Sequence, residues 1–145
     1  METFRRIMVA TDGSDVSLKA ARAAVTLAMR LGPDLLVAHV VDDEVVKEIS
    51  RALARDEKDA RKIMCEKAER YLAEVQNIAN QNSVAAVGRI EYGAPHEVLL
   101  RIAERENRDL MVMGKTGRRG LRRALTGSVT RRVIDLAEIP ILAVK

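Results

Sequence analysis

The sequence predicts an α/β fold in which a five-stranded parallel sheet carries helices on both faces. Five short runs rich in Val, Ile, Leu and Met, typical of strands buried on both faces, alternate with segments whose apolar residues recur at helical spacing. Strands and helices that alternate in this way form parallel sheets with right-handed crossovers. The 145 residues contain no repeat or low-complexity linker, so we expect one domain over residues 1–145.

The first strand and helix follow from an apolar run and its two flanking turns. Residues 7–10 are continuously apolar, and Thr11-Asp12-Gly13-Ser14 interrupts the run. Ser14 or Asp15 can cap the helix that follows, because both residue types accept hydrogen bonds from the first free backbone amides. Gly32-Pro33 is expected to end this helix. Its apolar positions have helical spacing: Leu18, Ala21, Val25, Ala28 and Leu31.

The second strand is expected over residues 35–41, before a long charged stretch. Within that stretch, apolar residues recur three or four apart between Met64 and Ile78, which predicts a helix that ends before Asn80. Residues 43–58 fit either an extension of this helix or a separate excursion.

The remaining elements complete the alternation. A third strand is expected over residues 84–91, and Pro95 suits the first turn of the helix after it. A fourth strand, residues 110–113, ends at Gly114. A helix from about Ser128 to Leu136 and a fifth strand over residues 141–144 follow.

Sheets of this kind commonly have the strand order 3-2-1-4-5 or 2-1-3-4-5, and they bind ligands at the carboxyl ends of strands where the order reverses. Small and polar residues follow the first strand (Thr11, Asp12 and Gly13) and the fourth strand (residues 114–117). The order 3-2-1-4-5 makes these two strands neighbours. We therefore expect that order, with a site in the crevice between them.

Charge is concentrated in one part of the chain. Seven of the 25 Lys and Arg residues lie within residues 115–132, which contain no Asp or Glu, whereas the rest of the chain has 18 cations against 21 anions. Such a cluster attracts phosphate. Cys65 is the sole cysteine and no apolar run approaches about 20 residues, so we expect a cytoplasmic protein that does not enter a membrane.

The same segment contains a glycine pattern, Gly114-Lys115-Thr116-Gly117, then nine residues, then Gly127-Ser128. Glycines let backbone amides approach a phosphate closely, and a helix that begins at Ser128 offers free amides and a favourable dipole. Lys115 and arginines such as Arg118 can balance the remaining charge. Gly114 could instead simply end a strand and Gly127 belong to an ordinary loop, but the combination favours an anion site. A Walker loop is excluded because Asp109 occupies the position of its first glycine.

The chain resembles the universal stress protein family, in its ATP-binding branch. The resemblance rests on the spacing G-x2-G-x9-G-S, on residues 7–14 (IMVATDGS), on residues 39–42 (HVVD) and on residues 139–144 (IPILAV). It implies the order 3-2-1-4-5 in a Rossmann-like fold of the adenine nucleotide alpha hydrolase type. It also implies bound ATP, AMP or ADP, a Mg²⁺ or Mn²⁺ ion on the phosphates, and a homodimer through Ile141 to Val144.

Carried over by position, the resemblance assigns roles to individual residues. Ala10, Thr11 and Asp12 are expected along the adenosine, and the backbone of Val40 at the adenine edge. Met113 and Gly114 are expected to form the floor of the site. The expected phosphate ligands are Gly117, Gly127, Ser128 and Val129, with Lys115 and Arg118 supplying positive charge.

Three functions remain open from the sequence. The first is a nucleotide-binding regulatory or stress-response module. The second is a slow metal-dependent ATPase or phosphotransferase, although no nucleophile with a base and an orienting acid can be assembled, so no catalytic residue is assigned. The third is a nucleic-acid binder that uses the Arg-rich segment, against which the scarcity of aromatic stacking residues argues. His39 is expected to be a packed or hydrogen-bonded residue of the second strand.

Overall fold

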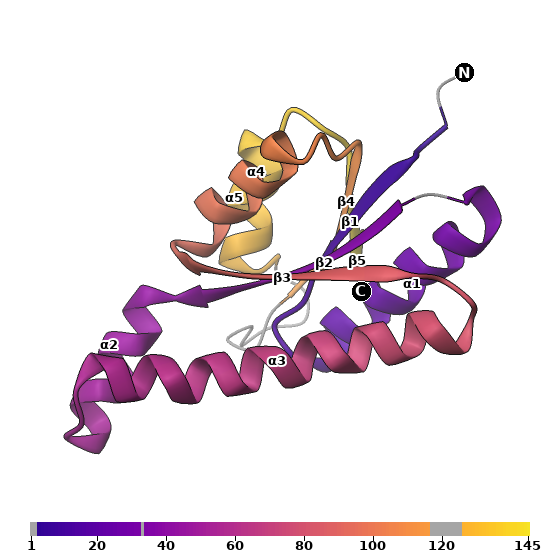
Figure 1. The fold of residues 1–145 in the computed structure, drawn as a ribbon. Coiled ribbons are helices and arrows are strands. Elements are labelled where there is room, and N and C mark those ends of the chain that lie inside the picture. Colours follow the sequence, from indigo (N-terminus) through magenta and orange to yellow (C-terminus); the bar gives the residue numbers. More distant parts are fainter. Residues whose placement is uncertain (1–2, 33, 117–125) are drawn as a thin grey trace.

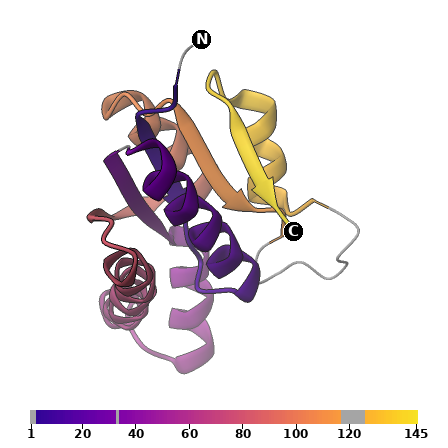
Figure 2. The same cartoon turned by 90° about the vertical axis from the view of Figure 1, so that its right-hand side faces the viewer.

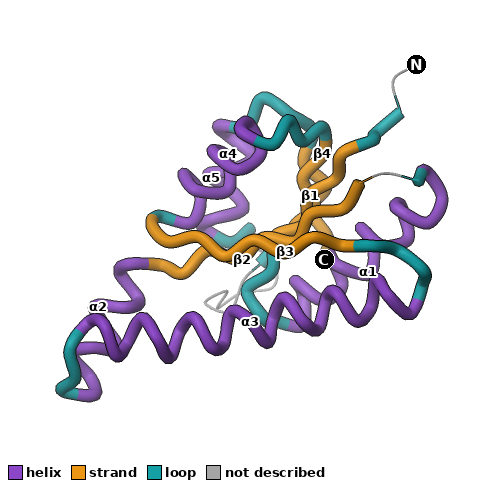
Figure 3. Tube along the Cα trace, viewed as in Figure 1, coloured by secondary structure: helices purple, strands orange, loops and turns teal. Residues whose placement is uncertain are grey.

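The computed structural model describes residues 3–32, 34–116 and 126–145. Their path is shown in Figure 1 and the distribution of helices and strands in Figure 3. In chain order, the elements are β1 (Arg6–Ala10), α1 (Asp15–Leu31), β2 (Asp34–Asp42), α2 (Asp43–Leu53), α3 (Glu57–Gln81), β3 (Ala86–Gly93), α4 (Pro95–Arg105), β4 (Leu110–Gly114), α5 (Ser128–Leu136) and β5 (Ile141–Val144).

The five strands form one parallel sheet in the order β3-β2-β1-β4-β5, which confirms the predicted fold class and strand order. β1 lies at the centre, where Ile7 pairs with Leu35 of β2 on one side and with Leu110 of β4 on the other. The chain therefore reverses its direction of winding at β1, and the carboxyl ends of β1 and β4 lie next to each other.

Helices cover both faces of the sheet, α1 and α3 on one and α4 and α5 on the other (Figures 1 and 2). Successive residues of β1 point to opposite faces, so Ile7 and Val9 pack with α1 and α3 while Met8 packs with α4 and α5. All three side chains are fully buried. This two-sided burial explains why the strands are continuously apolar in sequence.

The ambiguous stretch forms a separate short helix, α2, rather than an extension of α3. Asp42 caps α2 by accepting a hydrogen bond from the Glu44 amide, and Ala54 ends it in the left-handed conformation at φ 50°. Asp56 then caps α3 through the Asp59 amide. Each helix thus has its own N-cap. The two aspartates, Asp42 and Asp56, are the local sequence feature that marks α2 and α3 as separate helices.

Three predicted boundaries were wrong by two residues, namely the end of the long helix and both ends of the third strand, which ends at Gly93 instead of residue 91. The long helix continues through Gln81 instead of ending before Asn80, since Asn82 provides the C-cap. The third strand begins at Ala86 instead of residue 84, because the Val84 amide donates to the Ala79 carbonyl and is not available to the sheet.

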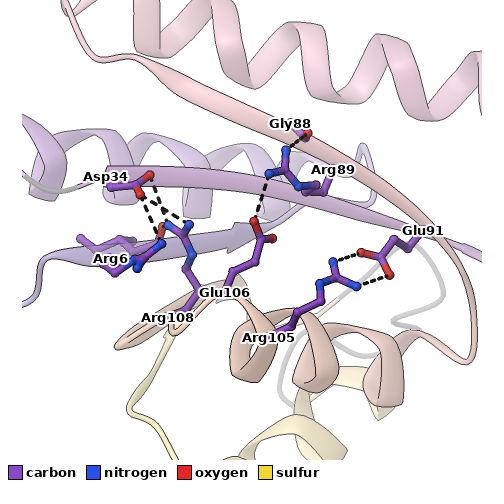
Figure 4. Close-up of polar contacts among 9 residues, drawn as sticks. Arg6, Asp34, Gly88, Arg89, Glu91, Arg105, Glu106 and Arg108 are labelled. Carbon is purple, nitrogen blue, oxygen red and sulfur yellow. Dashed lines mark hydrogen bonds and ion pairs between the residues drawn. The ribbon is translucent and has the colours of Figure 1, made fainter.

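Arginine–carboxylate pairs connect strands of the sheet with α4 and with the residues that follow it (Figure 4). Arg89 of β3 pairs with Glu106 at 3.0 Å, and Arg105 of α4 pairs with Glu91 of β3. The hydrogen bond from Arg105 lowers the pKa of the Glu91 carboxyl below its ordinary value. Strand β3 is at an edge of the sheet, so these two pairs attach it to α4.

The Arg108 side chain is the most buried cation of this group, with 3% of its surface exposed. Its guanidinium lies 3.3 Å from the Asp34 carboxylate and donates to the Ile7 carbonyl at 3.5 Å. A buried guanidinium is costly unless a carboxylate compensates it. The Asp34 carboxylate, at the start of β2, provides this compensating negative charge. The ion pair thus connects the residues just before β4 with β2.

Asp34→Ala is expected to lower the free energy of unfolding by about 2 kcal/mol, because it leaves the Arg108 guanidinium buried without its carboxylate. Urea unfolding monitored by circular dichroism measures this. Arg6→Met is the control, since Arg6 also pairs with Asp34 but is half exposed, and it should cost less than about 0.5 kcal/mol. Equal losses in the two variants would contradict the role given to Arg108.

Candidate functional site

A pocket of about 450 Å³ opens at the carboxyl ends of β1, β2 and β4 and at the start of α5. This is the edge at which the winding of the sheet reverses, the position expected for a ligand in an open parallel sheet. Helices α2 and α3 close the pocket beyond β2, and the first turn of α4 contributes Pro95 and Leu99.

Nine of the twelve residues singled out from the sequence line this pocket: Ala10, Thr11, Asp12, Val40, Met113, Gly114, Gly127, Ser128 and Val129. Lys115 is not among the lining residues. Its amide donates to the Val144 carbonyl at 2.7 Å and its carbonyl accepts from the Gly127 amide at 2.8 Å. Gly117 and Arg118 lie outside the described residues, as do Arg119, Arg122 and Arg123, so the nucleic-acid hypothesis stays untested.

The turn after β1 is held by hydrogen bonds within the turn and to α1. The Asp12 carboxylate accepts from the Ser14 amide at 2.9 Å, and the Ser14 hydroxyl accepts from the Ser17 amide at 3.2 Å, so Ser14 is the N-cap of α1. The hydroxyls of Thr11 and Ser17 hydrogen-bond each other at 3.2 Å. Asp12 therefore shapes the turn and also lines the pocket.

The start of α5 forms the opposite wall of the pocket. Gly127 is its N-cap and offers no side chain to the first amides of the helix. The first intrahelical bond runs from the Arg131 amide to the Gly127 carbonyl, so the amides of Ser128, Val129 and Thr130 have no acceptor within the helix. Free amides at a helix N-terminus bind anions, and the helix dipole adds to the attraction.

Two side chains near this helix start have different roles. The Thr130 hydroxyl donates to the Gly114 carbonyl at 2.8 Å and fixes α5 to the end of β4. The Ser128 hydroxyl has no hydrogen-bond partner among the residues that the structure describes. It lines the pocket and can donate to a ligand.

The sequence analysis missed the wall formed by α2 and α3. Met64, Lys67 and Tyr71 line the pocket from α3, and Val45 and Ile49 line it from α2. The three residues of α3 are three and four positions apart, so they share one face of the helix. A lysine within an otherwise apolar stripe was the only signal of this wall, and it gave no indication of which strand the helix would cover.

His39 is buried, as expected, and it lines the pocket. Its Nδ1–H donates to the Thr11 carbonyl at 2.6 Å, since a carbonyl can only accept. The edge of the ring meets the Tyr71 ring, with 5.4 Å between centroids. His39 thereby connects β2, the turn after β1 and α3.

The described residues contain no group of three or more His, Cys, Asp or Glu side chains arranged to hold a metal ion. The search for membrane spans, over the same part of the chain, found no helix with the length and apolarity to cross a bilayer.

Known proteins resemble this chain along nearly its whole length. The profile described as "Universal stress protein family" matches residues 3–145. The chain belongs to the universal stress protein family. Universal stress protein MJ0531 of Methanocaldococcus jannaschii is 34% identical to it over 142 residues, which are 98% of this chain and 82% of that protein.

Two solved structures show the same arrangement of elements. The protein MJ0577 of Methanocaldococcus jannaschii, described as a test case of structural genomics, is 26% identical and superposes with a TM-score of 0.86, and the match covers 99% of this chain and 97% of that one. A universal stress protein from Archaeoglobus fulgidus, solved in complex with dAMP, is 20% identical with a TM-score of 0.72, and the match covers 99% and 100% of the two chains. The second likeness, at this low identity, shows the Rossmann-like fold of the family.

In this universal stress protein, the turn after β1 leaves no room for a side chain at Gly13. A Cβ atom at Gly13 would lie 2.3 Å from Cε1 of the Tyr71 ring, and the residue has φ +79°. Gly13 therefore needs both the left-handed conformation and the absence of a side chain.

Gly13→Ala is expected to destabilise the protein by roughly 2–3 kcal/mol, from left-handed strain and from displacement of the Tyr71 ring. Gly32→Ala is the matched control, because Gly32 has φ +67° and no atom within 4 Å of the place that a methyl group would occupy, and it should cost about 1 kcal/mol from strain alone. Thermal and urea unfolding measure both. Combining Gly13→Ala with Tyr71→Ala should give a smaller loss than the sum of the two; strictly additive losses would show that the ring does not restrict Gly13.

Proposed function

We propose that this universal stress protein binds an adenine nucleotide, ATP in the first place, and acts in the cytoplasm as a regulatory or stress-response module. The observation that carries the proposal is the first turn of α5. Its first amides, which have no acceptor within the helix, and the Ser128 hydroxyl, which has no partner among the described residues, line a pocket at the point where the sheet reverses its winding. This combination suits a phosphate tail attached to a larger group in the crevice.

The proposed pose extends across the sheet from β4 to β2. Gly127, Ser128 and Val129 bind the phosphates, with Gly117, Lys115 and Arg118 contributing as the family resemblance implies. Ala10, Thr11 and Asp12 lie along the adenosine, the Val40 backbone meets the adenine edge, and Met113 and Gly114 form the floor. The dAMP held by the Archaeoglobus fulgidus protein supports an adenine nucleotide as the ligand class.

A divalent cation, Mg²⁺ or Mn²⁺, belongs to this proposal as a partner of the phosphates. The family resemblance implies such an ion, and Mg²⁺ in particular is commonly bound through substrate phosphates with few protein ligands. What the chain contributes is the cradle of amides that fixes the phosphates to which such an ion binds.

We further propose a homodimer through β5. This strand is at the edge of the sheet, so one row of its backbone hydrogen-bonding groups has no neighbouring strand in the described part of the chain. The Leu142 side chain is 39% exposed on it. An apolar, uncharged edge of this kind is suited to pairing with a second copy.

Gly127→Val is expected to remove measurable ATP binding in titration calorimetry with Mg²⁺ present. The N-cap has φ −61° and ψ 154°, which valine adopts readily, so the fold should persist while a branched side chain enters the phosphate cradle. Ala94→Val is the matched control, since Ala94 caps α4 with a similar extended backbone, is exposed and does not line the pocket. Unchanged ATP affinity in folded Gly127→Val would refute the assigned site.

Leu142→Glu is expected to weaken self-association at least about tenfold, because it removes buried apolar area and places like charges in apposition. Sedimentation velocity over a micromolar concentration series measures the dissociation constant. Leu53→Glu, at an exposed leucine of α2, should leave it unchanged. A wild-type protein that sediments only as a monomer would contradict the dimer.

A further inference from the structure

The pocket wall contains a lysine that the pose above does not use. Lys67 is half buried on α3, between Met64 and Tyr71 on the face that lines the pocket. It is the only Lys or Arg among the lining residues that the structure describes. Its ammonium makes no hydrogen bond or ion pair with any of those residues.

This placement leaves the ammonium available to a ligand. A half-buried lysine packs its aliphatic stem against its neighbours while its ammonium keeps contact with water, and an acceptor in the pocket can replace that water. Lys62, on the same helix, is exposed instead. Several other polar side chains around the pocket have partners within the protein, as in the pairs Thr11–Ser17 and Thr130–Gly114, and Ser128 belongs to the start of α5 on the opposite wall.

The position of Lys67 in the sheet order separates it from the phosphate cradle. Helix α3 packs against β2, β3, α2 and α1, whereas the cradle is formed by the end of β4 and the start of α5, with which α3 has no comparable contact among the described residues. β1 lies between β2 and β4. Lys67 therefore belongs to the end of the pocket opposite the free amides of α5.

The surroundings of Lys67 at that end fit a nucleobase. Val45, Ile49 and Met64 supply apolar surface suited to the faces of a planar ring. The edges of adenine present ring nitrogens that accept hydrogen bonds, and an ammonium carries three donors and no acceptor. A phosphate at this end would have Lys67 as its single cation among the described lining residues and would lie away from the amides of α5.

We propose that Lys67 is a specificity-determining residue for the base, donating a charge-assisted hydrogen bond to a ring nitrogen of adenine. This inference rests on the proposed nucleotide site and adds the residue that recognises the base. Because the contact is made to the base, its contribution to affinity is the same whatever the number of phosphates.

Lys67→Met tests the proposal, since methionine preserves length and helix propensity but removes the donor. Titration calorimetry with ATP, ADP and AMP is expected to show the same loss for all three, about 10- to 100-fold. Among the 1-deaza, 3-deaza and 7-deaza analogues of ATP, the one that lacks the contacted nitrogen should bind wild type and Lys67→Met equally. Lys62→Met should bind every ligand as wild type does.

The outcomes separate this inference from the nucleotide site itself. A wild-type protein that binds no adenine nucleotide refutes the proposed function, and this inference with it. Binding by wild type with unchanged affinities in folded Lys67→Met overturns the role of Lys67 alone. A loss that grows from AMP to ATP, or that is equal for all three deaza analogues, shows a general charge effect and also overturns it.

Discussion

The reversal of winding at β1 is the constraint on which the site depends. Because β2 and β3 lie on one side of β1 and β4 and β5 on the other, the connections that leave β1 and β4 diverge to opposite faces of the sheet. No helix can cover the carboxyl ends between them, and the resulting crevice is the pocket. Any other order of the same five strands would close this gap or place it elsewhere.

Around the crevice, the backbone is fixed by short contacts between elements that are distant in sequence. Tyr71 occupies the space beside Gly13, and His39 donates to the Thr11 carbonyl, so α3 and β2 together hold the turn after β1. On the other side, the Thr130 hydroxyl holds the start of α5 against the end of β4. The two walls of the pocket are thus set by contacts within the protein, and the first amides of α5 have no acceptor within the helix.

The polar side chains fall into two groups, those that pair with each other within the protein and those that line the pocket without such a partner among the described residues. At the amino end of the sheet, Arg108 is matched with Asp34, and along β3 two arginine–carboxylate pairs attach this edge strand to α4 (Figure 4). These charges are compensated internally and serve the fold. At the carboxyl end, Ser128 and Lys67 lack such partners among the described residues, which is the pattern of groups that complete their interactions with a bound molecule.

The sequence by itself determined the elements and the glycine-containing turns that line the pocket at the ends of β1 and β4. Strands buried on both faces are continuously apolar, and the turn glycines and the start of α5 depend on local backbone chemistry, so residues 7–14 and Gly114 to Ser128 could be recognised from short patterns. Only the tertiary structure decided that Lys115 points its backbone to β5 and lies outside the pocket wall, and that Met64, Lys67 and Tyr71 lie inside it. Helical periodicity identifies which residues share a face, but the strand that this face covers is set by long-range packing of the whole sheet, and no local pattern encodes it.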